Sequence, residues 1–414
     1  MKKHTSKITT KSIEQSGLPN DYKKAVSEYI WNSFDAGATR VNLTYQGNEL
    51  GRLESFSIGD NGKGIDMSKI DESFGKFLDS DKRDPVNQEN FQKGRKGKGR
   101  FAFSIFANQC SWRTSYSEPS GKTLSYQIQI NKSDLQHFFT GENTIEKGAK
   151  PGTIVNFYDF FELSANSLAS KEFENYLSGE FGWFLFLNKG RNLTISINGA
   201  DLPYQDRIAD SHEELLDIGD DRFKVVFLRW DQKIGDKYFF YFLNQKQKEQ
   251  TKRHTSFNNK AIEFHHSLYI TSAFFDSFHE TKDDHPVFEQ FENNQQHPTF
   301  RNLLKALNSI VSKKEKDYIR DVQANNLIHD YHSKGVFPDT NSRAGELEES
   351  VKEIYCAEPK IFQSSNLQQS KMIVGLLNII LATGNSEHIV PLIQNITALT
   401  EEEIENLVQV HVDR

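Results

Sequence analysis

One segment near the start of the chain, Asn20–Ala36 with the sequence NDYKKAVSEYIWNSFDA, carries two different stripes of side chains. Its apolar residues recur at the spacing of one buried helix face, which predicts a helix packed against a core. Asn20 or Asp21 suits the position that caps the start of this helix. A second stripe holds Glu28 and Asn32, so a carboxylate and a carboxamide lie one turn apart beside the buried face.

An isolated Glu-x-x-x-Asn pair on a helix usually belongs to a solvated polar face, and alone it predicts no function. Here three further motifs follow it in order. They are IGDNGKGI at 58–65, GRKGKGRFAF at 94–103 and PGTIV at 151–155. A helix with a polar stripe followed by two glycine-rich turns favours a binding site over a solvated face.

Together these four segments resemble the GHKL ATPases, a superfamily that includes gyrase B, the heat-shock chaperone ATPase, histidine kinases and MutL. The phrase EYIWNSFDAGATRVNL is most similar to the MutL and MORC branch. The resemblance covers about residues 15–200, weakens over 200–300 and is lost after about 340. It implies a Bergerat-type α/β sandwich that binds ATP and Mg²⁺ and hydrolyses ATP to ADP and phosphate.

The helical stripe suits the hydrolysis of ATP. Glu28 is placed to act as a general base for the attacking water. Asn32 offers a neutral amide oxygen, which ligates Mg²⁺ without adding negative charge beside a triphosphate. The resemblance implies the same two roles. Asp35, one turn further on, is either part of the site or a hydrogen-bond partner of the turn at Gly37.

The adenine end of the site is expected at Asp60, which follows a predicted buried strand. Its carboxylate would accept a hydrogen bond from the adenine amino group. Gly62 and Gly64 allow a ligand to approach the backbone closely. The resemblance implies that Thr153 in PGTIV completes the adenine pocket, directly or through water.

The basic glycine-rich segment suits a lid over the phosphates. Its glycines fit the G-x-x-G-x-G pattern of the family, and backbone N–H groups before a helix favour anions. A solvated basic loop and a DNA-contacting loop are the alternatives. The expected contact residues are Gly94, Gly97, Lys98, Gly99 and Arg100.

A further cation is expected from a second domain. In gyrase B a Gln-Thr-Lys loop brings its lysine to the terminal phosphate, and the same triplet ends here at Lys252. Lys260 competes for the role. The whole segment 244–260 is basic, so its residues alone favour a solvated loop.

The remaining pattern predicts an α/β sandwich with helices on one sheet face. Residues 66–93 are polar and charged, which is typical of a loop or a mobile lid. An apolar helical pattern covers 101–108, and an amphipathic helix is expected at 169–187. Strands are expected at 40–45, 53–59, 123–130, 152–158 and 193–197.

We expect four parts in the chain. They are an ATP-binding domain over 1–200, a transducer-like α+β domain over 201–330, a linker over 331–345 and a helical interaction module over 346–414. The second part contains predicted strands at 223–230, 237–243 and 267–275 and a helix at 299–325. The tail contains apolar helical patterns at 367–381 and 386–396 and a capping box from Thr400 to Glu403.

Composition narrows the class of protein. The formal net charge is −7, which does not favour strong nonspecific binding to nucleic acid. Cys110 and Cys356 are the only cysteines, so a disulfide framework is excluded. No segment reaches the ~18 apolar residues of a membrane span. We expect a cytoplasmic protein.

Two functions compete. In the first, ATP binding orders the lid, joins two chains into a homodimer and signals to a protein partner through the C-terminal helices. In the second, the chain is a DNA-binding repair or restriction module of MutL or MORC type that binds ATP without significant hydrolysis. A histidine kinase is disfavoured, because His4 alone precedes Glu28. A link to bacterial defence systems rests on analogy of domain architecture.

Overall fold

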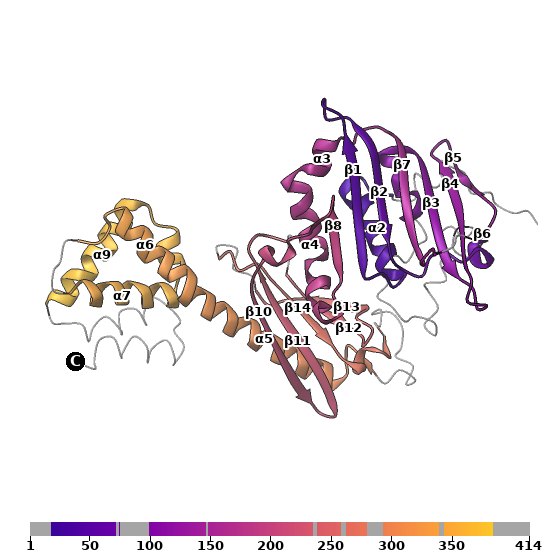
Figure 1. The fold of residues 1–414 in the computed structure, drawn as a ribbon. Helices are drawn as coiled ribbons and strands as arrows, with labels where there is room; N and C mark the ends of the chain where they lie inside the picture. Colours follow the sequence, from indigo (N-terminus) through magenta and orange to yellow (C-terminus); the bar gives the residue numbers. More distant parts are fainter. Residues whose placement is uncertain are drawn as a thin grey trace, which may run out of the picture. The chain divides into compact units, whose positions relative to one another are not determined.

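The computed structural model describes most residues of the chain (Figure 1). These are 18–71, 74, 99–145, 148–234, 238–257, 262–279, 293–338 and 343–383. The chain divides into two compact units. One consists of residues 1–253 and 265–297, and the other of residues 254–264 and 298–414. The four-part division expected from the sequence stays a prediction.

The first described helix, α2 (Tyr22–Asp35), has the expected buried face. Asp21 caps its start, because its side chain accepts a hydrogen bond from the Lys24 amide at 3.0 Å. Gly37 lies just beyond its end with φ at 77°, a conformation that favours glycine. The residues that it buries in the core include Ala25, Val26, Tyr29, Ile30 and Phe34.

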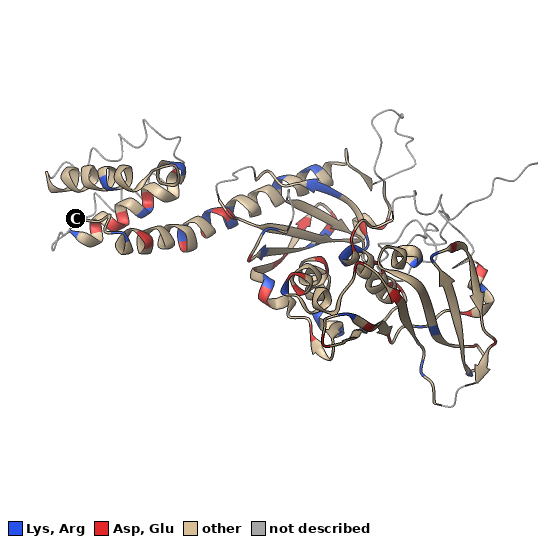
Figure 2. Cartoon of the chain, turned by 90° about the horizontal axis from the view of Figure 1, so that it is seen from above, with Lys and Arg blue, Asp and Glu red and all other residues tan. Residues whose placement is uncertain are grey.

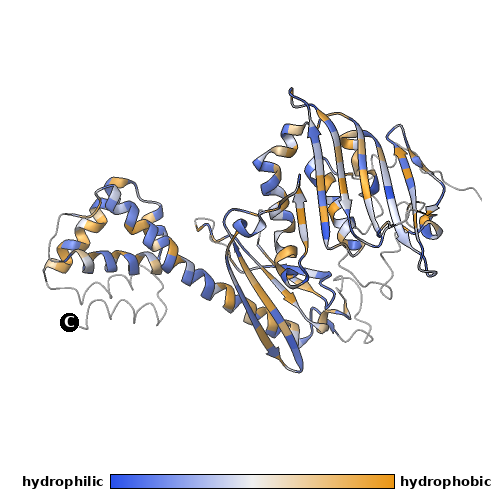
Figure 3. Cartoon of the chain, viewed as in Figure 1, coloured by the Kyte–Doolittle hydropathy of each residue, from blue (hydrophilic) through white to orange (hydrophobic). Residues whose placement is uncertain are grey.

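A nine-stranded sheet forms the main layer of the first unit, in the order β5-β4-β3-β7-β2-β1-β8-β9 with β6 beside β4. Neighbouring strands are antiparallel except β1 and β8. Hydrophobic and hydrophilic residues alternate along the strands, as Figure 3 shows. The bounds are β1 (Arg40–Gly47), β2 (Leu53–Asp60), β3 (Ala107–Ser117), β4 (Thr123–Asn131), β5 (Asp134–Thr140), β6 (Thr144–Ile145), β7 (Gly152–Phe160), β8 (Thr194–Ile197) and β9 (Ala200–Asp201).

The main core lies between this sheet and the helices α2, α3 (Ala165–Ala169) and α4 (Lys171–Leu187). α2 and α4 pack through aromatic rings, with the centroids of Phe34 and Phe184 5.0 Å apart. The mixed α/β fold predicted from the sequence is confirmed. The helix expected over 169–187 is interrupted at Ser170, whose side chain caps α4 by accepting from the Phe173 amide at 3.2 Å.

The prediction of a helix over 101–108 is wrong. Residues Gly99–Ile105 form a short 3₁₀ helix, η5, and β3 begins at Ala107. Short apolar runs fit a helix or a strand equally well in sequence. The outcome is decided by pairing, because β3 hydrogen-bonds along its length to β4 on one side and β7 on the other.

A second sheet of five strands follows in the first unit, in the order β10-β11-β14-β12-β13. The predicted strands at 223–230, 237–243 and 267–275 correspond to β11, β12 and β14, although a 3₁₀ helix, η8 (Ala273–Phe275), ends the last of them. The bounds are β10 (Ile208–Ile218), β11 (Asp221–Trp230), β12 (Phe239–Leu243), β13 (Glu249–His254) and β14 (His266–Thr271). Short pairs elsewhere are β15 (Phe278–His279) and β16 (Asn293–Asn294).

The prediction of a solvated loop over 244–260 is wrong for the middle of that segment. Residues 249–254 form β13, an edge strand beside β12. Thr251 is buried whereas Lys252 is exposed, which is the alternation of a half-buried strand. Charged residues on an edge strand discourage pairing with another chain, and this explains a strand with so basic a sequence.

Helix α4 also packs on the second sheet. The rings of Trp183 on α4 and Tyr269 on β14 are stacked, with centroids 4.9 Å apart and planes 5° apart. Tyr269 stacks in turn on Tyr241 of β12 at 5.1 Å. The side of α4 that faces the second sheet is therefore held by aromatic contacts within the first unit.

The second unit is helical, which confirms the helical C-terminal part. Its helices are α5 (Pro298–Tyr318), α6 (Asn325–Ser333), α7 (Ala344–Ala357), α8 (Lys360–Gln363) and α9 (Leu367–Ala382), with a π-helical segment at Ile319–Ala324. Lys and Arg residues occur beside Asp and Glu residues along α5 and α7 (Figure 2). Within the expected linker 331–345, residues 331–333 belong to α6 and residues 344–345 to α7.

Two predictions for the tail, the helix at 386–396 and the capping box at Thr400, lie outside the described residues. Within the described part, no helix is both long enough and apolar enough to cross a membrane.

Candidate functional site

Asp60 ends β2 and lies opposite Thr153 on β7 in the sheet register. Its Oδ2 is 3.1 Å from the hydroxyl of Ser33 on α2. Its Oδ1 accepts a hydrogen bond from the Gly62 amide at 2.8 Å. Burial raises the pKa of the Asp60 carboxyl above its ordinary value, whereas the hydrogen bonds from Gly62 and Ser33 lower it. The strand end thus presents a partly buried carboxylate whose orientation is fixed by two hydrogen bonds.

The turn after Asp60 requires its two glycines for reasons of space. A Cβ on Gly62 would lie 2.9 Å from the carbonyl oxygen of Ala36. Gly64 has φ at +73°, and a Cβ there would lie 1.9 Å from the carbonyl oxygen of Ser115. This turn therefore packs directly on other parts of the same chain. The close approach of a ligand to Gly62 and Gly64, which the sequence analysis expected, stays a prediction.

Thr153 is buried beside a second threonine that the sequence analysis did not identify. Its hydroxyl oxygen is 3.1 Å from that of Thr114 on β3. The Thr114 hydroxyl also accepts a hydrogen bond from the Ile65 amide at 2.9 Å. The two threonines link β3 and β7 to the turn that follows Asp60. Thr114 follows the expected helix of 101–108, in a stretch for which no strand was predicted.

Glu28 and Asn32 lie on the partly exposed face of α2, next to the start of η5. A Cβ on Gly99 would lie 3.0 Å from Oε2 of Glu28 and 3.2 Å from Nδ2 of Asn32. The backbone at Gly99 therefore packs against both side chains. The structure brings together the carboxylate, the carboxamide and the last glycine of the G-x-x-G-x-G pattern, which the sequence predicted to act together.

Arg100 follows directly but is mostly buried. Its guanidinium lies 4.5 Å from the ring centroid of Phe101 and 5.9 Å from that of Phe74. Burial lowers its pKa to about 10, so the side chain is still a cation at neutral pH. Gly94, Gly97 and Lys98 lie outside the described residues.

Two other candidates from the sequence analysis are Lys252 and Asp35. Lys252 is on β13, with its ammonium nitrogen 4.8 Å from the ring centroid of Phe239. Asp35 is buried at the end of α2. Lys260, the competing lysine, is outside the described residues. The role of Lys252 as a phosphate contact stays a prediction.

Ser33 is another residue that the sequence analysis did not identify as functional. It lies within the phrase NSFDA of α2 and connects that helix to the carboxylate of Asp60. Its hydroxyl is also 3.1 Å from the carbonyl oxygen of Tyr29, the bond that a serine inside a helix often makes. The one feature of the sequence that points to Ser33 is its position next to Asn32.

One family model matches part of this chain. Residues 20–150 match the family model for histidine kinase-, DNA gyrase B- and HSP90-like ATPases. Similar solved structures include the ATPase region of Saccharomyces cerevisiae topoisomerase II, at 14% identity over 61% of this chain and 72% of that chain, with a TM-score of 0.38. The same region bound to ICRF-187 (dexrazoxane) matches at 14% identity over 61% of this chain and 73% of that chain, also with a TM-score of 0.38. No curated protein matches the sequence.

The family match spans α2, β2 with its glycine turn, and η5, and it ends just before β7, the strand that carries Thr153. Placement in the MutL and MORC branch stays a prediction. The resemblance to the GHKL ATPases is confirmed over residues 20–150, the range that the model of the histidine kinase-, DNA gyrase B- and HSP90-like ATPases matches.

Proposed function

We propose that this chain binds ATP with Mg²⁺ and hydrolyses it slowly, using nucleotide binding as a conformational switch. One observation supports the proposal above the others. Helix α2 contacts the Asp60 carboxylate through Ser33 and the Gly99 backbone through Glu28 and Asn32. A base-recognising group and a phosphate-side group are therefore fixed by one rigid element.

The adenine end consists of Asp60 and its surroundings. A carboxylate suits the amino group of adenine because it only accepts hydrogen bonds when ionised. The hydrogen bonds from Gly62 and Ser33 fix its orientation, which limits the entropy lost on binding. Thr153, buried beside Asp60, supplies a hydroxyl that can contact the base directly or through water.

The phosphate end consists of Glu28, Asn32 and the segment that begins at Gly99. Asn32 fits a Mg²⁺ ligand because its amide oxygen is neutral and its side chain is partly exposed. When bound, Mg²⁺ would neutralise charge on the phosphates. Glu28 accepts a proton from water as the water oxygen bonds to the terminal phosphorus. The bond from that phosphorus to the bridging oxygen breaks, and ADP and phosphate leave.

The switch would use the connection between the two sheets of the first unit. Trp31 on α2 donates a hydrogen bond from its indole N–H to Glu180 on α4 at 2.9 Å. Trp183, one turn along α4, stacks on Tyr269 of the second sheet. A shift of α2 on nucleotide binding would thus reach the second sheet through packed groups. Pairing of two chains on ATP binding, and a protein partner for the C-terminal helices, complete the proposal.

Calorimetry and light scattering test this function together. The full chain is titrated with ADP and with a nonhydrolysable ATP analogue, each with Mg²⁺, and its mass is measured in each state. We expect binding of both nucleotides and a doubled mass with the analogue alone. A chain that binds neither nucleotide would contradict the proposal. A salt-sensitive shift of DNA mobility without a change in mass would favour the DNA-binding alternative.

A further inference from the structure

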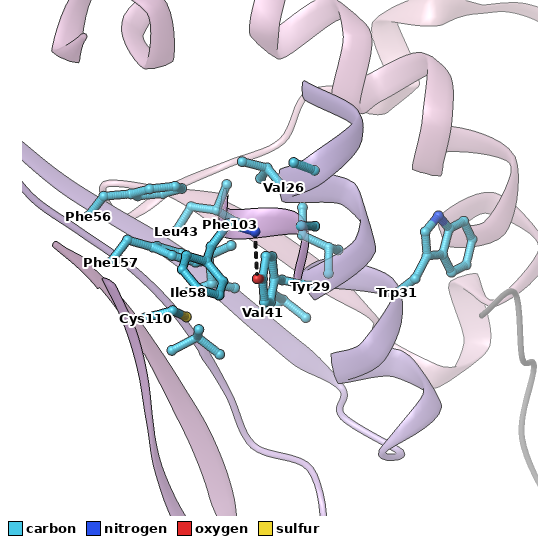
Figure 4. Packing of buried hydrophobic residues seen from close by; sticks show 14 of the residues in the cluster. Val26, Tyr29, Trp31, Val41, Leu43, Phe56, Ile58, Phe103, Cys110 and Phe157 are labelled. Carbon is cyan, nitrogen blue, oxygen red and sulfur yellow. Dashed lines mark hydrogen bonds between the residues drawn. The ribbon is translucent and has the colours of Figure 1, made fainter. Parts of the chain in front are cut away.

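The hydroxyl of Tyr29 on α2 lies inside the first turn of η5. It donates a hydrogen bond to the carbonyl oxygen of Arg100 at 3.2 Å and accepts one from the Phe103 amide at 3.0 Å. Figure 4 shows the second bond as a dashed line between the two segments. Arg100 and Phe103 are three residues apart, the separation at which a 3₁₀ turn closes its own hydrogen bond. The hydroxyl therefore takes part in the bonding that shapes this turn.

The ring of Tyr29 is held in place by packing. It meets the ring of Phe157 edge to face, with centroids 5.1 Å apart and planes at 72°. Trp112 lies on the same cluster, with its ring centroid 6.5 Å from that of Tyr29. The side chain is only 3% exposed, and burial raises its pKa well above the ordinary value. The hydroxyl is thus protonated at neutral pH, with one hydrogen to donate and lone pairs to accept.

This side chain connects the two parts of the phosphate end. Tyr29 is the next residue after Glu28, and Arg100 is the next residue after Gly99. Gly99 in turn packs on Glu28, because a Cβ there would lie 3.0 Å from the carboxylate oxygen Oε2. The distance between the general base and the glycine backbone therefore depends on the turn that the hydroxyl holds.

We propose that Tyr29 is a positioning residue whose hydroxyl sets the Gly99–Phe103 turn against Glu28, and that affinity for a nucleoside triphosphate depends on it. The proposal rests on the function proposed above, in which Glu28 acts beside the terminal phosphate. Groups next to Glu28 would contact the terminal phosphate, which ATP carries and ADP lacks. They would not contact the two phosphates of ADP. Loss of the hydroxyl would let the Arg100 carbonyl pair directly with the Phe103 amide, and the turn would move relative to Glu28.

The substitution Tyr29→Phe tests this inference, because it keeps the ring and removes the hydroxyl that bonds to Arg100 and Phe103. It also removes the contact of that hydroxyl with the Cys110 thiol. Its matched control is Tyr22→Phe on the same helix, where the lost bond runs to the Ser167 carbonyl at 3.3 Å. Affinities for ADP and for a nonhydrolysable ATP analogue with Mg²⁺ are measured by calorimetry on the full chain. We expect Tyr29→Phe to lower the affinity for the analogue about fivefold or more. The affinity for ADP should change less than about twofold. Tyr22→Phe should change neither.

Each other outcome is decisive. Equal weakening of both nucleotides by Tyr29→Phe would mean that Tyr29 supports the core alone, and unchanged affinities would mean that the turn does not depend on it. A wild-type chain that binds neither nucleotide would refute the proposed function instead. If the variant does not fold, amide exchange of residues 99–103 in the wild type answers the question. The inference requires slower exchange with the analogue than with ADP, and equal rates overturn it.

Discussion

The hydroxyl of Ser33 and the carboxylate of Asp60 lie 3.1 Å apart, which joins the helix α2 to the end of strand β2. Five residues earlier on the same helix, Glu28 packs against Gly99. An α-helix rises about 1.5 Å per residue, so the two contacts are separated by roughly 7.5 Å along the helix axis. One helix therefore links the proposed adenine end to the proposed phosphate end, and changes at either end give separable predictions.

The stability of the chain should depend on pH through Asp60. Burial raises the pKa of this carboxyl, so the folded state holds the proton more tightly than the unfolded chain does. Its contribution to the free energy of unfolding is fully present below the ordinary pKa of 3.8 and is lost as the pH rises through the raised value. We therefore expect the free energy of unfolding of the wild type to fall relative to that of Asp60→Asn as the pH rises from 3.8 through the raised pKa. Urea denaturation at a series of pH values measures this difference, and a difference that grows with pH would refute the assignment.

The substitution Gly99→Ala should impair turnover more than stability. The new Cβ would lie 3.0 Å from Oε2 of Glu28, and the ends of flexible side chains can move aside by a few tenths of an ångström. That movement displaces the general base, for which we expect turnover to fall about tenfold. The free energy of unfolding should change by less than about 0.5 kcal/mol.

Gly179→Ala is the matched control for that variant, because Gly179 lies inside α4 with nothing within 4 Å of an added Cβ. It should raise the free energy of unfolding by about 0.5–1 kcal/mol and leave turnover unchanged. Equal turnover in Gly99→Ala and the wild type would show that Gly99 does not position Glu28.

The sequence was sufficient to predict the local parts of the site. Helix α2 follows from its apolar spacing, and the turn at Gly62 and Gly64 follows from glycines after a strand. These features depend on residues close together in the chain. The placement of Glu28 and Asn32 on one face of the helix follows from the helical period. The α/β class follows from the alternation of such elements.

The remaining parts depend on residues that are distant in sequence. Tyr29 meets the Arg100 carbonyl 71 positions later, and Thr114 meets Thr153 39 positions later. Strand β3 was missed for the same reason, because its pairing with β7 decides its conformation. No local pattern carries such information, so the hydroxyl inside the turn and the threonine pair could not be predicted.

Removal of the general base should separate binding from chemistry. With Glu28→Ala we expect ATP to bind with nearly unchanged affinity, because Asp60 and Asn32 remain. Turnover should fall roughly 10²–10⁴-fold, the usual effect of losing a general base. A steady-state phosphate-release assay with Mg²⁺ measures it. The control Glu172→Ala removes a surface carboxylate that pairs with Lys23 and should leave turnover unchanged. Hydrolysis at the wild-type rate in Glu28→Ala would show that another group activates the water.

The central claim, that ATP binds with its adenine on the Asp60 carboxylate, is tested most directly by calorimetry of Asp60→Asn. The asparagine carbonyl can still accept from Gly62, and its amide can face the Ser33 hydroxyl, so the free energy of unfolding at neutral pH should change little. The same amide would face the donor amino group of adenine. We predict that the affinity for a nonhydrolysable ATP analogue falls more than about tenfold, which is the effect of losing a hydrogen bond to a charged group. An affinity equal to that of the wild type would mean that Asp60 only shapes the turn, and the account of this site would be wrong.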